Sequence, residues 1–251
     1  MDKLYTINRE GCSLHCRLYA NDPAPRRIVV YGHGFGGHRD NKAGERFARH
    51  ILEKNKGVGL VAFNWPCHGD DVHKTLRLAD CDRYLRLVLE DLQERFAPEA
   101  VYGHATSFGG YLFLKYISDH GNPFRRAAFR CPAVNMLQVL TGIIADLDVL
   151  ARIEKGKPEP VGFDRKILVD KTLLDQLRDA DVTRRDYLPY ADDLLILHGT
   201  ADEVVPFGAV KAFAEENVIE FEAVDGADHR FQNPRHMDAA VARTAAFFDM
   251  R

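Results

Sequence analysis

Residues 100–112 read AVYGHATSFGGYL, and this stretch decides the fold. It opens as a short buried strand and turns helical after Ser107. Ala105 to Gly109 fit the GxSxG pattern, in which a serine is held on a sharp strand-to-helix turn, with alanine in the first glycine position. Small neighbours are needed because bulky side chains on either side would collide at such a turn. The stretch therefore predicts a strand, a strained turn at Ser107 and a helix over 107–119.

The same alternation of strand and helix extends in both directions along the chain. Apolar runs typical of buried strands occur at 27–32, 58–64, 100–103, 126–131, 193–199 and 218–224. Amphipathic segments typical of helices occur at 41–54, 82–96, 107–119, 207–216 and 235–250. Two runs at 2–7 and 13–20, joined by turn residues, predict an N-terminal hairpin. The predicted fold class is α/β, with a doubly wound, mostly parallel sheet of about eight strands and helices on both faces.

One long segment breaks this rhythm. Residues 133–190 begin with an apolar helical run, cross a loop rich in glycine and proline, and then resume a helical pattern. We interpret them as an insertion between two strands of the sheet. The predicted organisation is a core domain formed by 1–132 and 191–251, interrupted by the insertion at 133–190.

Composition excludes several classes of function. The chain has 251 residues and a net charge of −3, from 34 basic and 37 acidic residues, so it lacks the basic surface that nucleic-acid binding requires. Its five cysteines show no CxxC pair, which argues against a disulfide framework and a zinc site. Neither a signal-peptide pattern nor a run of 18 apolar residues occurs. We expect a soluble, cytoplasmic protein without a metal or cofactor that binds neither membranes nor nucleic acid. The oligomeric state stays open.

A glycine-rich loop follows the strand at 27–32. It reads His33-Gly34-Phe35-Gly36-Gly37, and together with Gly32 it also fits the GxGxxG pattern of a dinucleotide site. Such a site needs an acidic residue about 20 positions further on, at the end of the next strand. Asn64-Trp65-Pro66 stands there instead, so we disfavour dinucleotide binding. The glycines instead allow a sharp turn that brings backbone N–H groups close to a ligand.

Two later strand ends supply an acid and a base. Asp202 follows the strand at 193–199, and His229 lies in the loop after the strand at 218–224. Because the carboxyl ends of parallel strands meet at one edge of a sheet, we expect both side chains to lie near Ser107. Three other histidines precede glycines near strand ends, and we interpret them as structural: His33, His68 and His198.

These motifs, in this order, resemble the α/β-hydrolase fold family, particularly its small bacterial serine esterases and the related serine aminopeptidase group. The resemblance rests on HGFGG at 33–37, ATSFGG at 105–110, HGTADEVVP at 198–206 and GADHRF at 226–231. It covers nearly the whole chain except the insertion, where members of the family carry variable lids. It therefore implies that 133–190 form a lid. Ala105 and Asn64 depart from the residues that are usual in the family.

The resemblance implies a role for each matching residue. Ser107 corresponds to the nucleophile, His229 to the general base and acid, and Asp202 to the residue that orients the imidazole. The same roles follow from chemistry, because a serine hydroxyl attacks poorly unless a base takes its proton. The backbone N–H groups of Phe35 and Phe108 are expected to form the oxyanion hole.

The expected substrate is a small-molecule ester with a small or aromatic acyl group. Three apolar residues are predicted to line its pocket, Trp65, Leu140 and Ile144. An aminopeptidase remains an alternative and would need a carboxylate to hold the free amine of its substrate; Asp146, Asp148 and Glu154 are candidates. A thioesterase on the same residues and a non-catalytic ligand receptor on the same fold also remain open.

Overall fold

An eight-stranded sheet forms the centre of the molecule. The computed structural model describes residues 1–162 and 165–250, and the strands follow the order β1-β2-β4-β3-β5-β6-β9-β10. This confirms the predicted α/β class and the size of the sheet. The strands are β1 Asp2–Arg9, β2 Cys12–Ala20, β3 Arg27–Gly32, β4 Val58–Phe63, β5 Ala100–Thr106, β6 Ala127–Arg130, β9 Leu194–Gly199 and β10 Glu220–Val224.

Strand direction brings the motif-bearing loops to one edge of the sheet. The predicted N-terminal hairpin forms, because β1 pairs antiparallel with β2, which in turn pairs antiparallel with β4. Every pair from β4 to β10 is parallel. The carboxyl ends of β3, β5 and β9 therefore lie at the same edge, as expected for a doubly wound sheet.

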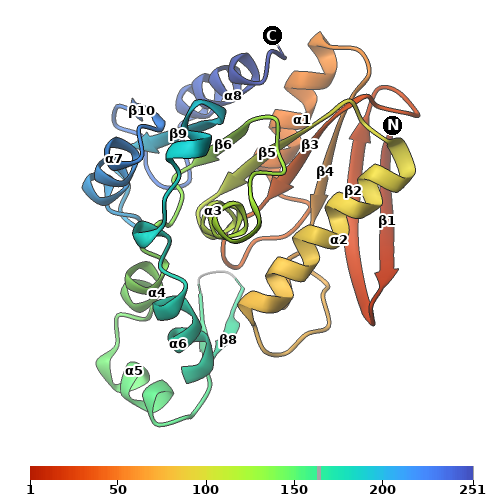
Figure 1. The fold of residues 1–251 in the computed structure, drawn as a ribbon. Helices are drawn as coiled ribbons and strands as arrows, with labels where there is room; N and C mark the ends of the chain where they lie inside the picture. Colours follow the sequence, from red (N-terminus) through yellow and green to blue (C-terminus); the bar gives the residue numbers. More distant parts are fainter. Residues whose placement is uncertain (163–164, 251) are drawn as a thin grey trace.

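Helices cover both faces of the sheet (Figure 1). α1 (Lys42–Lys54) and α8 (Pro234–Phe247) pack on one face, where Phe47 and Ala245 join the buried side chains of the strands. α2 (Leu78–Phe96), α3 (Phe108–His120) and α7 (Phe207–Glu216) pack on the other. Central strands such as β4 are buried along their whole length, which explains their uninterrupted apolar runs.

The insertion has its own secondary structure and projects from one side of the core in Figure 1. Its elements are α4 Met136–Ile144, α5 Leu147–Glu154, β7 Glu159–Val161, β8 Ile167–Val169, α6 Lys171–Asp179, and the 3-10 turns η1 Val182–Arg184 and η2 Leu188–Asp193. Buried leucines of α4 and α6 belong to the same apolar cluster as α2 and α3. The insertion is thus packed onto the core.

Two details of the insertion differ from the sequence prediction. The apolar run that predicts one helix forms two, because Ala145 adopts a left-handed conformation (φ 53°) and the Asp146 side chain accepts hydrogen bonds from the first amides of α5. The segments β7 and β8 pair as a short antiparallel ladder, and their three residues each are too few for a periodic signal. Across residues 1–162 and 165–250, no helix has the length and apolar character that crossing a membrane requires.

Candidate active site

Ser107 lies on a strained turn between β5 and α3. Its backbone has φ 51° and ψ −118°, a combination that few residues other than glycine adopt. The turn is tight because α3 starts against the end of β3: a Cβ atom on Gly109 would lie 2.5 Å from the carbonyl oxygen of Gly32. The backbone carbonyl of Ser107 accepts hydrogen bonds from the amides of Tyr111 and Ala133, both at 3.1 Å. These contacts fix the serine at the edge of the sheet.

The structure brings Ser107, His229 and Asp202 together. His229 Nδ1–H donates to Asp202 Oδ2 at 2.8 Å, and the Ser107 hydroxyl donates to His229 Nε2 at 3.1 Å. The tautomer follows from the partners, because an ionised carboxylate only accepts and therefore faces the protonated nitrogen. The other nitrogen is left free to accept the proton of the serine. The arrangement can therefore move a proton from the hydroxyl to the imidazole.

Asp202 is held by several donors from its own loop and from neighbouring segments. Its side chain is 0% exposed. Oδ1 accepts hydrogen bonds from the backbone amides of Val204 at 2.9 Å and Val205 at 2.8 Å. Burial alone would raise the pKa of Asp202, but the hydrogen bond and charge of His229 and the two amides lower the pKa below its ordinary value. Asp202 therefore stays ionised at neutral pH.

The two amides predicted to form the oxyanion hole lie on segments next to Ser107. Phe108 is the first residue of α3, where an amide has no partner inside the helix and the helix dipole favours negative charge. Phe35 lies in the tight turn closed by the hydrogen bond from Gly37 N–H to Gly34 O. That turn lies against the serine, since a Cβ on Gly34 would lie 3.8 Å from Ser107 Oγ. Among the described residues, neither amide donates to a protein acceptor.

Aromatic rings surround the same turn. Phe35 meets Phe108 edge-on at 5.7 Å between ring centroids, and His68 stacks on Phe108 at 6.0 Å. Phe35 is half-buried, so part of its side chain is exposed. Trp65 is fully buried, packs on Phe63, and donates its indole N–H to the carbonyl of His33. The sequence analysis predicts that Trp65 lines the pocket, but in this structure Trp65 has no exposed surface.

The other two predicted pocket residues lie in the insertion. Leu140 is fully buried within the main apolar cluster, and Ile144 is half-buried against it. Neither lines the cavity of about 250 Å³ that opens between α3, α4, α6 and η1. That cavity is lined by neighbours of theirs in the same apolar run, including Val134 and Leu137, and by Tyr111 one helical turn after the serine. The sequence analysis assigned Leu140 and Ile144 to the pocket, whereas in this structure other residues of the same segment line the cavity.

Two sequence features have structural explanations away from the chemistry. Asn64 donates to Asp70 Oδ1 at 2.6 Å and accepts the Arg39 amide at 2.7 Å, so it stabilises the loop that follows β4. His33 is buried, and its Nδ1–H donates to the carbonyl of Gly34 at 2.8 Å. Burial lowers the pKa of His33 well below its ordinary value, so it is neutral. Both residues shape the loops that carry the site.

The carboxylates suggested for binding a substrate amine lie elsewhere. Asp146 caps α5 and Glu154 lies near Lys171 and Arg178 at 3.7 Å from each, while Asp148 is exposed. A carboxylate that the sequence analysis did not single out lies closer. Glu203 is exposed and accepts the backbone N–H of His229 at 3.2 Å. Its position directly after Asp202 is the signal that could have identified it.

One group of side chains has the composition of a metal site. Ligand atoms of Cys131, His198 and Asp202 lie within 4.8 Å of one another. The nitrogen of His198 nearest to Asp202 faces two oxygen acceptors, Asp202 Oδ2 at 3.3 Å and Val205 O at 3.1 Å, so it carries a proton and cannot coordinate a cation. The group is therefore a hydrogen-bonded cluster behind the aspartate.

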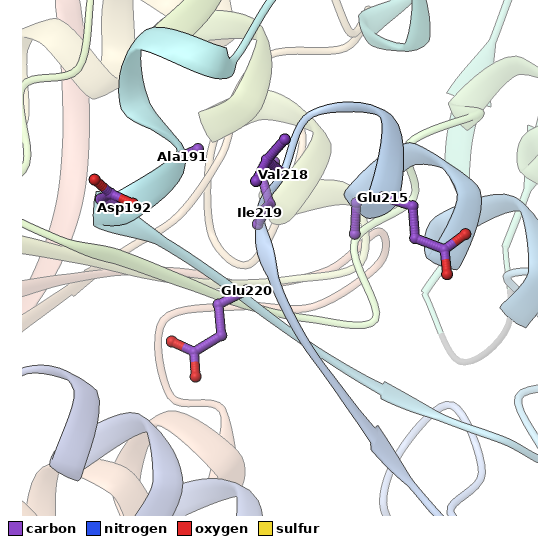
Figure 2. Close-up of a pocket in the computed structure, with 7 residues that line it drawn as sticks. Ala191, Asp192, Glu215, Val218, Ile219 and Glu220 are labelled. Atoms are coloured by element: carbon purple, nitrogen blue, oxygen red, sulfur yellow. The ribbon is translucent and has the colours of Figure 1, made fainter.

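A second pocket, of about 420 Å³, lies at the opposite edge of the sheet (Figure 2). It is formed where β9 and β10 begin, whereas Asp202 and His229 follow the ends of these strands. In Figure 2 the carboxylates of Asp192, Glu215 and Glu220 stand apart and do not converge on one point. The pocket is separate from the site at Ser107.

A parallel sheet with a serine on its strand-to-helix elbow is the architecture of the α/β-hydrolases, and comparison with known proteins agrees. Residues 64–251 match the model of the prolyl oligopeptidase family. Because this match spans well over half of the chain, the chain belongs to that family. The prediction of an α/β-hydrolase is confirmed, and membership places the protein among the serine hydrolases of this fold.

Solved structures show the same fold along nearly the whole chain. Est1E from Butyrivibrio proteoclasticus is 17% identical with a TM-score of 0.74, over 98% of this chain and 99% of that one. Mouse alpha/beta hydrolase domain-containing protein 10 is 15% identical with a TM-score of 0.72, over 98% of each chain. XC6422 from Xanthomonas campestris, a serine hydrolase described as lacking a lid, is 16% identical with a TM-score of 0.67, over 99% and 94%. A comparison with curated protein sequences finds no match.

Proposed function

We propose that this protein hydrolyses carboxylic esters of small or aromatic acyl groups through an acyl-enzyme intermediate. In this proposal Ser107 is the nucleophile, His229 the general base and acid, and Asp202 the residue that orients the imidazole. The observation that carries it is the continuous chain of hydrogen bonds at 3.1 Å from the hydroxyl to the imidazole and 2.8 Å from the imidazole to the carboxylate.

Acylation begins when Ser107 Oγ attacks the carbonyl carbon of the ester and its proton passes to His229 Nε2. The carbonyl oxygen becomes an oxyanion that the amides of Phe35 and Phe108 stabilise. The tetrahedral intermediate collapses, the bond to the alcohol oxygen breaks, and the imidazolium gives its proton to that oxygen. Asp202 stabilises the imidazolium between these two transfers. The product of this half-reaction is the alcohol and an ester on Ser107.

Deacylation repeats the sequence with water as the nucleophile. His229 takes a proton from the water, the hydroxide attacks the acyl carbon, and the Ser107 oxygen leaves with the proton from the imidazolium. The carboxylic acid is released and the starting protonation is restored. Each oxyanion-hole amide contributes about 3 kcal/mol to barrier lowering in enzymes of this kind.

The proposed acyl pocket is the cavity of about 250 Å³ between α3 and the insertion. Its position near the serine in the chain supports this assignment, because Tyr111, which lines the cavity, lies one helical turn after Ser107 and donates its amide to the Ser107 carbonyl. Val134, a second lining residue, directly follows Ala133, which donates to the same carbonyl. We propose that 133–190 act as the lid of a core formed by 1–132 and 191–251. Est1E, a structural neighbour, has been solved with ferulic acid bound, in keeping with an aromatic acyl group.

An aminopeptidase is the second candidate, and one observation favours it. Glu203 places an exposed carboxylate beside His229, where it could hold the free amine of an aminoacyl substrate. The two candidates separate in one assay. An esterase releases p-nitrophenol from p-nitrophenyl acetate and benzoate, whereas an aminopeptidase releases p-nitroaniline from aminoacyl anilides and loses this activity in Glu203→Gln. A thioesterase is distinguished by turnover of acyl thioesters in preference to both.

A fluorophosphonate probe tests whether the protein is a serine hydrolase at all. The probe labels an activated serine, so we expect one adduct, located on Ser107 by peptide mass spectrometry. Ser107→Ala should remain folded, take up no probe and lose ester turnover by about 10⁶-fold in kcat. A wild-type protein that stays unlabelled and hydrolyses none of the substrates would favour the non-catalytic receptor.

A further inference from the structure

His198 is the penultimate residue of β9, and its side chain contacts Asp202. It is 0% exposed. Its Nε2 lies 3.3 Å from Asp202 Oδ2 and 3.1 Å from the carbonyl oxygen of Val205. Asp202 Oδ2 is the same oxygen that receives the Nδ1–H of His229. Two imidazoles therefore meet at one carboxylate oxygen.

The partners of His198 determine which of its nitrogens carries the proton. Both neighbours of Nε2 are acceptors, so Nε2 is protonated: its N–H donates to the Val205 carbonyl and lies 3.3 Å from Asp202 Oδ2. The other nitrogen, Nδ1, is buried and has no hydrogen-bond partner among the described residues. Adding a proton there would place an unpaired charge in the interior, and burial accordingly lowers the pKa of His198. His198 is thus a fixed neutral donor.

The groups packed around this contact include a second neutral donor. Cys131, at the end of β6, faces Asp202 with a thiol whose pKa is raised by burial, so it stays protonated. The ring of Phe207, the first residue of α7, meets the His198 ring edge-on at 5.9 Å. Arg130 donates to the carbonyl of Arg230 at 3.0 Å, and Glu203 accepts the backbone N–H of His229 at 3.2 Å.

We propose that His198 is a positioning residue for the reaction: its Nε2–H, 3.3 Å from Asp202 Oδ2, stabilises the negative charge on the oxygen that orients His229 and so weakens the attraction of that oxygen for the imidazolium. This inference rests on the proposed function. The sequence analysis interpreted His198 as a structural histidine. The proposal gives it a further role, because its contact with Asp202 affects His229.

The proposal predicts a change in the pH profile. Without the His198 donor, Asp202 Oδ2 attracts the protonated His229 more strongly, so the base is occupied by a proton up to a higher pH. The acid limb of kcat/KM for p-nitrophenyl acetate should move upward by about one pH unit. The plateau above the limb should fall by about tenfold or less, because the nucleophile and the oxyanion hole are unchanged. A purely structural role would lower activity or stability without moving the limb.

Three substitutions of His198 distinguish the effect of losing its N–H donor from the effect of losing its ring. In His198→Leu the donor is removed. Glutamine reaches as far as Nε2 and keeps a donor there, so His198→Gln should retain the wild-type limb. Asparagine is polar but too short to reach Asp202, so His198→Asn should behave like the leucine variant. His104→Leu is the matched control, since His104 is also buried but donates only to the carbonyl of Ala128 at 3.0 Å.

The outcomes are separable from those of the proposed function. A limb shift in the leucine and asparagine variants, absent in the glutamine variant and the His104 control, supports the proposal. The same limb in all four variants and the wild type overturns it. Wild-type ester turnover and fluorophosphonate labelling establish the activity independently of these results. ¹⁵N NMR of the wild type is a check that needs no variant: His198 should show a protonated Nε2 and an unprotonated Nδ1 at pH 7, and the opposite tautomer would overturn the proposal.

Discussion

Gly32 and Ala105 are paired across β3 and β5, and the missing side chain of the first makes room for the methyl group of the second. A Cβ atom on Gly32 would lie 3.3 Å from Ala105 Cβ and 2.9 Å from Cε1 of Phe113. Ala105 is fully buried there. This pairing explains why alanine can occupy the position before the nucleophile turn where the family usually has glycine.

Gly32→Ala should therefore destabilise the fold. The added methyl would overlap the Phe113 ring and crowd Ala105, at a cost of about 1–3 kcal/mol in the free energy of unfolding. Ala105→Gly relieves one of the two contacts, so the double variant should lose less than the sum of the single losses. Urea denaturation of the four proteins gives the coupling energy, and strictly additive losses would refute the pairing argument.

Gly109 and Gly142 make opposite predictions for the same substitution. Gly109→Ala would bring a methyl group to 2.5 Å from the Gly32 carbonyl oxygen, so we expect a loss of about 1–3 kcal/mol and a displaced Ser107 with reduced ester turnover. Gly142, within α4, has nothing within 4 Å of its added Cβ. Gly142→Ala should raise the unfolding free energy by about 0.5–1 kcal/mol, since alanine favours helix more than glycine does. Thermal and urea unfolding measure both, and equal effects at the two sites would count against this account.

Asp202→Asn should nearly abolish turnover while leaving the protein folded. An amide at this position can donate to His229 Nδ1, which favours the tautomer that carries its proton on Nε2 and so cannot accept from Ser107. We expect kcat for p-nitrophenyl acetate to fall by about 10⁴-fold. Asp192→Asn is the matched control, because Asp192 lines the pocket at the opposite edge of the sheet and should leave kcat unchanged. Turnover within tenfold of wild type in Asp202→Asn would remove Asp202 from the proposed mechanism.

Much of this arrangement could be predicted from the sequence because its signals are local. Apolar runs and amphipathic segments identify the strands and helices, and the parallel order of the sheet then brings the loops after β5, β9 and β10 to one edge. The proximity of Ser107, Asp202 and His229 follows from that topology. Their hydrogen bonds then depend on loop conformations of only a few residues.

The parts that sequence reasoning missed depend on side-chain direction and on contacts between distant segments. The apolar run at 133–152 indicates a pocket-forming segment, but which residues face the cavity depends on where the run breaks, and Ala145 breaks it through its backbone conformation. Trp65 is an aromatic residue of the kind that lines pockets, yet its indole N–H donates to the carbonyl of His33 inside the core. The position of His198 behind Asp202 likewise depends on the fold of the whole β9 loop.

Buried neutral histidines should make the protein lose stability in mild acid. Burial is the main cause that lowers the pKa of His68 and of His104 to about 4, from an ordinary value of 6.5. Between these values the unfolded chain binds protons that the folded protein does not, so the free energy of unfolding is highest above pH 6.5 and falls as the pH drops toward 4. Two histidines give a slope of about 2.4 kcal/mol per pH unit near pH 5. Urea unfolding at pH 7, 6 and 5 measures it. His104→Gln removes one titrating group and should reduce the slope by about 1.2 kcal/mol per pH unit; an unchanged slope in that variant would show that His104 is not held neutral by the fold.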